Sequence, residues 1–166
     1  MERNCPKYGK DYPDVTVTYE FVDAVAMRLI QWPNSYDVLI TSNLFGDILT
    51  DEASVISGSM GLMPSASVGS ENALYEPIHG SYPEATGKKI ANPIASILSL
   101  SMMLDYTFNL KKESEIINRA VESSLLDRYT TPDLNKDDRS YSTDEVGDYI
   151  VAVSYTHLTL PTNREV

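Results

Sequence analysis

The stretch Thr41-Ser-Asn-Leu-Phe-Gly-Asp-Ile-Leu-Thr-Asp51 combines the end of an apolar run, the start of a helix and two acids one helical turn apart. The residues just before it, 37–41, are mostly apolar and β-branched, which predicts a short buried strand. Ser42 or Asn43 can accept a hydrogen bond from a free helical N–H group, so we expect a helix to begin there. This order of elements predicts a strand, a cap and a helix.

Asp47 and Asp51 stand at positions i and i+4 of the expected helix, so their carboxylates can project from one face toward a common cation. Two acids on a solvated helix face are ordinary. Here the neighbours Phe45, Ile48 and Leu49 are apolar, which makes a fully solvated helix less expected. The pair therefore indicates a site for a hard cation.

Composition limits the classes of function. The chain has 166 residues, which fits one core of ordinary size or parts of two, and its 42% hydrophobic and 22% charged residues are typical of a globular protein. The formal charge of -11 argues against nucleic acid or an anionic membrane as a partner. A lone cysteine, Cys5, excludes an internal disulfide, and no apolar signal segment is visible. Both observations favour a reducing cytoplasm.

The remaining pattern predicts an α/β layered fold. Apolar and polar residues alternate over 15–20, which predicts a strand, and residues 22–30 have the spacing of a helix that must stop before Pro33. Strand, helix, strand, helix is the order expected for a mainly parallel sheet. Residues 58–93 are rich in glycine and proline yet carry too much apolar surface for a linker, so we expect an ordered ligand-binding loop with a short strand over 73–76.

Three helices are predicted after this loop region. The first begins right after Pro93, and the second carries the apolar stripe of residues 116–125. The third opens with the capping box Ser142-Thr-Asp-Glu145. Residues 154–166 lose the helical pattern and resemble translated adapter sequence, so this tail, including His157, is set aside as a non-native segment.

His79 is then the histidine left to consider, and a lone histidine in a loop is more often a hydrogen-bonded filler than a functional residue. Gly80 and Gly87 allow the backbone to approach a ligand closely. Neither a dinucleotide fingerprint nor a Walker loop is present, so the loop alone is a weak nucleotide signal.

Four motifs in sequence order carry a resemblance to a known family. They are Leu44-Phe-Gly-Asp-Ile-Leu-Thr-Asp51, Gly58-Ser-Met-Gly-Leu-Met-Pro-Ser-Ala-Ser67, Glu76-Pro-Ile-His-Gly-Ser81 and Ala91-Asn-Pro93. Together they resemble the C-terminal half of the isocitrate/isopropylmalate dehydrogenases, over about residues 12–153. The Glu-Pro-Ile-His-Gly-Ser form is more similar to the isopropylmalate branch. The resemblance implies that residues 1–57 form part of the smaller, dimer-forming domain and residues 58–153 part of the larger one.

The resemblance also implies a metal site shared across a homodimer. Asp47 and Asp51 match the two acids that bind Mg²⁺ or Mn²⁺ in one subunit, and Asp23 matches the acid that the neighbouring subunit contributes. Asp23 and Asp47 would then take part in catalysis through the metal. Taken alone, Asp23 is an ordinary acid in the first turn of a helix.

Residues of the loop region match the family's NAD site. Glu84 falls where NAD-using members carry an acid, and a carboxylate there accepts hydrogen bonds from the ribose hydroxyls and repels the 2′-phosphate of NADP. The matched positions are Glu76, His79, Gly80, Ser81, Glu84, Gly87, Ala91 and Asn92.

The implied reaction is the NAD-dependent oxidative decarboxylation of 3-isopropylmalate in leucine biosynthesis. The family's general-base lysine, its tyrosine acid and its substrate-binding arginines match positions upstream of Met1, so we expect a truncated chain that is inactive alone. Tartrate, D-malate, homoisocitrate and isocitrate dehydrogenases of the same family are alternatives. A non-catalytic nucleotide-binding or dimerising fragment, or an acidic metal-binding protein, is an alternative of another class.

Overall fold

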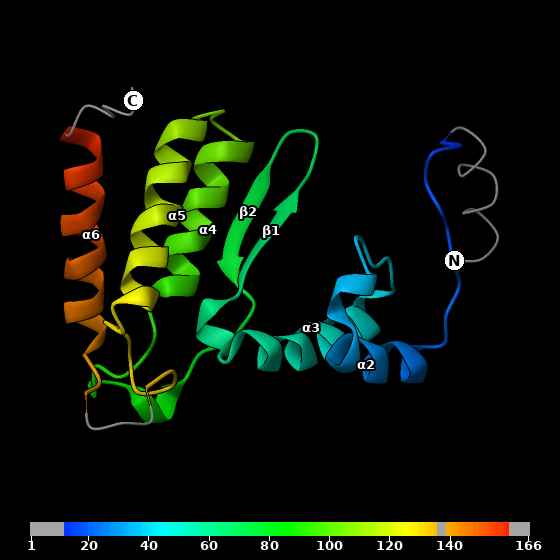
Figure 1. Cartoon of the computed structure of the whole chain (residues 1–166), viewed down its shortest axis with the longest axis horizontal. Coiled ribbons are helices and arrows are strands. Elements are labelled where there is room, and N and C mark those ends of the chain that lie inside the picture. The colour runs from blue at the N-terminus through cyan, green and yellow to red at the C-terminus, as the bar shows by residue number, and fades with distance from the viewer. Residues whose placement is uncertain (1–11, 136–138, 160–166) are drawn as a thin grey trace, which may run out of the picture. The chain divides into compact units, whose positions relative to one another are not determined.

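The computed structural model describes residues 12–135 and 139–159 (Figure 1). The chain divides into two compact units, with the boundary between Ile56 and Ser57. Each unit has a hydrophobic core of its own. The predicted assignment of residues 1–57 and 58–153 to the smaller and larger domains of a family fold stays a prediction.

The first unit is built on two helices, α2 (Val22–Gln31) and α3 (Asn43–Ser57). A short 3₁₀ turn, Pro33–Ser35, follows α2, and the proline ends the helix because it lacks the N–H that a further turn requires. The buried core of this unit consists of Val25, Leu29 and Leu49. Both helices lie where the sequence predicts them.

The two strands predicted in this unit are not formed. Residues 15–20 and 37–41 have no strand assignment, and the side chains that should have been half-buried are exposed: Val17 to 44% and Val38 to 79%. A strand needs a neighbour to pair its backbone groups, and neither segment pairs with a strand within the described residues. The alternation of apolar and polar residues gave no information about a pairing partner.

The second unit contains a β-hairpin made of β1 (Pro64–Val68) and β2 (Ala73–Pro77). The strands are antiparallel, with Ser65 opposite Glu76. The α/β class is confirmed, but the sheet of the described residues is this antiparallel pair and not the parallel sheet expected from strand–helix alternation. β1 was missed because Pro-Ser-Ala-Ser lacks the β-branched residues that signal a strand; its proline is tolerated at the first position of a strand.

Three helices complete the second unit: α4 (Ile94–Tyr106), α5 (Lys111–Leu126) and α6 (Thr143–Thr159). In Figure 1 they stand side by side, and contacts join α4 to α5, α5 to α6 and the hairpin to α4. Their shared buried core consists of Ile94, Ala120, Val121, Val146 and Ile150. All three predicted helices are confirmed.

The end of α6 corrects the prediction about the tail. The helical pattern was expected to stop at residue 154, whereas α6 continues to Thr159. The non-native origin of residues 154–166 stays a prediction, and both residues 160–166 and Cys5 lie outside the described residues. In the part of the chain that the structure describes, no helix has the length and apolar character needed to cross a lipid bilayer.

Candidate metal and nucleotide sites

The acid pair lies on α3 with the geometry that the sequence predicts. Asp47 and Asp51 are both exposed and stand one helical turn apart on that helix. The amide Nδ2 of Asn43 donates a hydrogen bond to Oδ2 of Asp47 at 3.0 Å, which fixes the side chain from the preceding turn. Carboxylate oxygens that remain open to solvent are ligands that Mg²⁺ and Mn²⁺ prefer. The donor chemistry of the pair therefore fits a hard divalent cation.

Asp23 lies in the first turn of α2 and is also exposed. Its Oδ1 accepts a hydrogen bond from the N–H of Ala24 at 2.8 Å, an ordinary contact at a helix start. Within the described residues, no three acids, histidines or cysteines come together as a metal site. One chain thus brings Asp47 and Asp51 together but does not add Asp23 to them, and the contribution of Asp23 from a second subunit stays a prediction.

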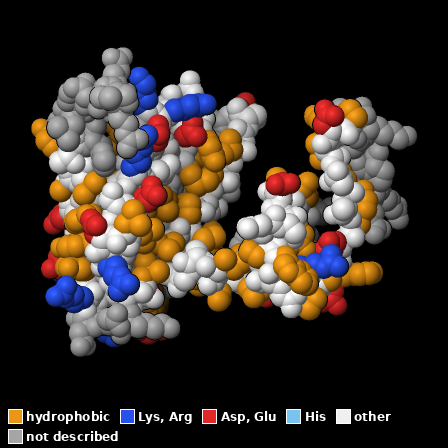
Figure 2. Space-filling model, viewed as in Figure 1, with side chains coloured by type: hydrophobic (Ala, Val, Ile, Leu, Met, Phe, Trp, Pro, Cys, Tyr) orange, Lys and Arg blue, Asp and Glu red, His pale blue; other side chains and the backbone are white. Residues whose placement is uncertain are grey.

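Apolar side chains share the surface of the first unit with these acids. Leu44, Phe45 and Ile48 of α3 are 66%, 43% and 55% exposed, while Leu49 is buried. Figure 2 shows hydrophobic side chains on the surface of both units. The expectation that apolar neighbours would withdraw α3 from solvent is therefore correct for Leu49 alone.

The predicted nucleotide loop begins at the end of β2. Glu76 is an exposed residue of that strand, and His79 follows it, partly buried, with Nδ1 at 3.0 Å from the carbonyl oxygen of Gly80. This short local contact matches the hydrogen-bonded filler role considered for a lone histidine. Gly80 and Ser81 are exposed.

The middle of the loop is a single 3₁₀ turn, Pro83–Ala85, which buries Ala85 and leaves Glu84 exposed. Gly87 has a φ of +76°, a conformation that costs glycine little and other residues more. The carboxylate of Glu84 is therefore exposed to solvent on a short 3₁₀ turn that is anchored by the buried Ala85.

The loop ends at Asn92, whose side-chain amide forms hydrogen bonds through both its oxygen and its nitrogen. Its Oδ1 accepts a hydrogen bond from the N–H of Ile94 at 3.0 Å, and its Nδ2 donates to Oδ2 of Asp133 at 3.0 Å. Gly61 packs directly against it, because a Cβ atom added at that glycine would lie 2.5 Å from Cβ of Asn92. The side chain of Asn92 thus closes the loop onto the start of α4.

Asp133 is a residue that sequence reasoning missed. Its carboxylate accepts hydrogen bonds from Ser59, Thr131 and Asn92, three residues far apart in the chain. Desolvation alone would raise the pKa of Asp133, but these hydrogen bonds outweigh it and hold the pKa below its ordinary value. No pattern in the sequence marks this acid, since its partners come from three separate segments.

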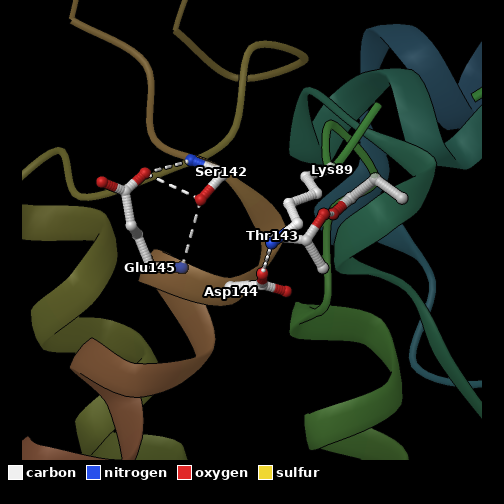
Figure 3. Close-up of polar contacts among 6 residues, drawn as sticks. Lys89, Ser142, Thr143, Asp144 and Glu145 are labelled. Carbon is white, nitrogen blue, oxygen red and sulfur yellow. Dashed lines mark hydrogen bonds and ion pairs between the residues drawn. The ribbon is translucent and has the colours of Figure 1, made fainter. Parts of the chain in front are cut away.

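The start of α6 confirms the predicted capping box and adds contacts to the loop (Figure 3). The N–H of Ser142 donates to Oε2 of Glu145 at 2.8 Å, and the N–H of Glu145 donates back to Oγ of Ser142 at 3.3 Å. The backbone and side-chain hydrogen bonds from Ser142 lower the pKa of Glu145. This box fixes the first turn of the helix, which also carries Thr143 and Asp144.

Thr143 and Asp144 connect this turn to the loop. The N–H of Thr143 donates to the carbonyl of Lys89 at 2.9 Å. The Oγ1 of Thr143 donates to the carbonyl of Ala91 at 2.6 Å. Nζ of Lys89 lies 2.5 Å from Oδ2 of Asp144, and this contact raises the pKa of Lys89. The sequence predicted the cap but not that its residues hold the loop.

Comparison with known proteins identifies the family of the chain. Residues 2–150 match the profile of the family described as isocitrate/isopropylmalate dehydrogenase. The chain is 53% identical over 125 residues to the 3-isopropylmalate dehydrogenase of Aquifex aeolicus, covering 75% of this chain and 34% of that protein. It is 52% identical over 141 residues to the enzyme of the same name from Bacteroides fragilis, covering 84% and 40%.

A solved structure shows the same fold. The crystal structure of isocitrate dehydrogenase from Methylococcus capsulatus superposes with a TM-score of 0.88 at 38% identity, over 92% of this chain and 45% of that one. The chain spans 34% and 40% of the length of the two curated relatives above. The profile match, the two relatives and this fold agree with one another: the chain belongs to the isocitrate/isopropylmalate dehydrogenase family.

Proposed function

We propose that the chain is part of an NAD-dependent 3-isopropylmalate dehydrogenase, which oxidatively decarboxylates (2R,3S)-3-isopropylmalate in leucine biosynthesis. The observation that carries this proposal is the match of about half the residues, over most of the chain, to proteins of that name. Family membership supports a dehydrogenase; the substrate and the cofactor are the proposed part. The alternative substrates are isocitrate, homoisocitrate, tartrate and D-malate.

In this proposal the exposed acids of α3 hold a divalent cation, Mg²⁺ or Mn²⁺. Asp47 and Asp51 donate oxygen ligands from one subunit, and Asp23 of a second copy completes the set. When bound, the cation supplies Lewis-acid stabilisation of negative charge on the substrate oxygen. Asn43 orients Asp47 through the 3.0 Å hydrogen bond between their side chains.

The loop after β2 holds NAD in this proposal. Gly80 and Gly87 allow close approach of the backbone, and Ser81 and Glu84 offer polar groups from exposed positions. The carboxylate of Glu84 accepts hydrogen bonds from ribose hydroxyls and disfavours a 2′-phosphate through charge repulsion. The loop therefore favours NAD over NADP.

A homodimer and a cytoplasmic location complete the proposal. A second copy is required to bring Asp23 to the acids of α3. The exposed apolar residues of the first unit, including Leu44 and Ile48, are of the kind that a subunit interface covers. The proposed cytoplasmic location rests on the family and on the lone cysteine of the chain.

Metal binding can be measured on the chain itself. Titration calorimetry with Mn²⁺ should show binding that Asp47→Asn weakens at least tenfold, because one of the two charged ligands on α3 is lost. Asp148→Asn is the matched control, since this exposed acid lies on α6. Equal Mn²⁺ affinity in wild type and Asp47→Asn would contradict the assignment of the acid pair.

The reaction can be tested in a chimera. The matched residues of this chain would replace their counterparts in the Aquifex aeolicus enzyme, and NADH formation from 3-isopropylmalate would be followed. We expect activity that depends on Asp47. A folded chimera that binds NAD but forms no NADH would favour the non-catalytic alternative.

The substrate needs a different measurement, because the chimera takes its substrate-binding residues from its host. The genomic sequence upstream of Met1 would show whether the reading frame encodes a longer protein. That protein would be assayed with isopropylmalate, isocitrate, homoisocitrate, tartrate and D-malate. The largest kcat/KM is expected with isopropylmalate, and a larger value with isocitrate would contradict the proposal.

A further inference from the structure

The second half of the candidate nucleotide loop has a backbone that needs support. Lys89 adopts a left-handed conformation with a φ of 54°, which is unfavourable for a residue with a Cβ atom. Such conformations persist where the surrounding structure holds them in place. The residue is exposed, so the support must come from specific contacts and not from burial.

Those contacts come from one residue of α6. Thr143 donates its backbone N–H to the carbonyl of Lys89 at 2.9 Å and its hydroxyl to the carbonyl of Ala91 at 2.6 Å. The two accepting carbonyls lie two positions apart, on either side of Ile90. One threonine thus fixes two peptide groups of the loop.

The neighbouring residues reinforce this contact. Asp144 pairs with the ammonium of Lys89, a contact drawn in Figure 3. Both partners are more than half exposed, so this ion pair adds little by itself. The capping box of Ser142 and Glu145 holds the turn that presents Thr143. The hydroxyl of Thr143 is therefore the group whose loss should affect the loop most directly.

We propose that Thr143 is a positioning residue for the dinucleotide: it holds the backbone of residues 89–91 in the conformation that the nucleotide loop needs for binding. The inference rests on the proposed function, because the loop's ligand is part of that proposal. It assigns a role in cofactor affinity to a residue 51 positions beyond Asn92, on a helix that does not belong to the loop.

The test uses the 166-residue chain and three variants. Thr143→Val keeps the shape of the side chain but removes the hydroxyl, while Thr143→Ser keeps the hydroxyl. Glu145→Ala removes the carboxylate that accepts from the N–H of Ser142 without removing a contact to the loop. Thermal melting reports the stability of the fold, amide hydrogen exchange over residues 86–92 and trypsin cleavage at Lys88 report the loop, and calorimetry with NAD reports binding.

Thr143→Val should speed exchange and cleavage in the loop and weaken NAD binding about fivefold, the expected effect of losing one hydrogen bond. Thr143→Ser should behave like wild type. Glu145→Ala should lower the melting temperature at least as much as Thr143→Val does, yet affect loop exchange and NAD affinity less, because the hydrogen bonds from Thr143 to Lys89 and Ala91 do not involve Glu145. This pattern separates positioning from a general effect on helix stability.

The contrary results are distinct. Wild-type affinity for NAD in Thr143→Val would overturn the inference while leaving the proposed function intact. Equal effects of Glu145→Ala and Thr143→Val on the loop would overturn it as well, because the role would then be structural only. A wild-type chain that does not bind NAD would contradict the nucleotide part of the proposed function, and the inference with it.

Discussion

Asp133 joins three segments of the second unit through a single carboxylate. It accepts hydrogen bonds from Ser59, Thr131 and Asn92, and a charged carboxylate is a stronger acceptor for these donors than a protonated carboxyl. A carboxylate with several donors is stabilised in its ionised state. The stability of this part of the fold should therefore depend on pH.

We expect the contribution of Asp133 to be lost in acid. The folded state lowers its pKa, so the stabilisation is fully present above the ordinary aspartate pKa of about 4 and is lost as the pH falls through the lower, folded value. Urea unfolding should show that Asp133→Asn costs about 1 kcal/mol at pH 7 and that the difference from wild type shrinks below about pH 4.

The control for this experiment is Glu122→Gln, which changes an exposed acid on α5. Its stability relative to wild type should change little between neutral and acid conditions. A deficit for Asp133→Asn that stays constant down to pH 3 would show that the hydrogen bonds do not depend on the charge of the carboxylate.

Glu84 gives a second test at the scale of one residue. In the chimera, Glu84→Gln should lower the ratio of kcat/KM for NAD to that for NADP by about tenfold, because the charge that repels a 2′-phosphate is removed. Steady-state assays with both dinucleotides measure the ratio. Glu71→Gln, an exposed acid outside the matched positions, is the control, and an unchanged ratio in Glu84→Gln would refute the role.

Among the elements, α6 shows how a local signal in sequence becomes structure. The capping box formed because both partners lie within one turn and need no distant residue. Glu145→Ala should measurably lower the free energy of unfolding, since it leaves the N–H of Ser142 without its acceptor. Denaturant unfolding followed by far-ultraviolet circular dichroism measures this loss, and Asp148→Ala on the same helix should cost much less.

The elements also show which parts of the fold the sequence could predict. Helices α2 to α6 were found because an apolar stripe and a cap are local features. The strand predicted over 73–76 is confirmed as β2, whereas its partner β1 was missed and the strands predicted over 15–20 and 37–41 do not form. Pairing depends on a partner that periodicity does not identify. The spacing of the two acids on α3 could be predicted because it is local to one helix. The contacts of Thr143 with the loop, and those of Asp133 with Ser59 and Asn92, join residues tens of positions apart and could not be predicted.

At the scale of the whole molecule, the two units have cores of very different size. The first unit buries three core residues and packs three partly buried apolar residues against them, while the second buries five core residues and packs seven partly buried apolar residues against them. Burial of apolar surface is the main favourable term in folding. The second unit should therefore be the more stable one.

Amide hydrogen exchange of the whole chain should show this difference directly. Amides of α2 and α3 should exchange much faster than those of α4, α5 and α6, because opening the first unit exposes less apolar surface. Equal protection of both units would contradict the expectation.

Val146→Ala, at a fully buried position, should lower the free energy of unfolding of the second unit by about 2 kcal/mol. Val151→Ala on the same helix is the control, since that side chain is 68% exposed.

The close packing of Gly61 against Asn92 has a consequence for how the family can change over time. A side chain at position 61 would occupy the space of Asn92, which accepts the N–H of Ile94 at the start of α4 and closes the candidate nucleotide loop. A mutation at either position therefore alters the selective cost of a mutation at the other. In lineages that retain asparagine at position 92, glycine should persist at position 61, and the two positions should drift only as a pair.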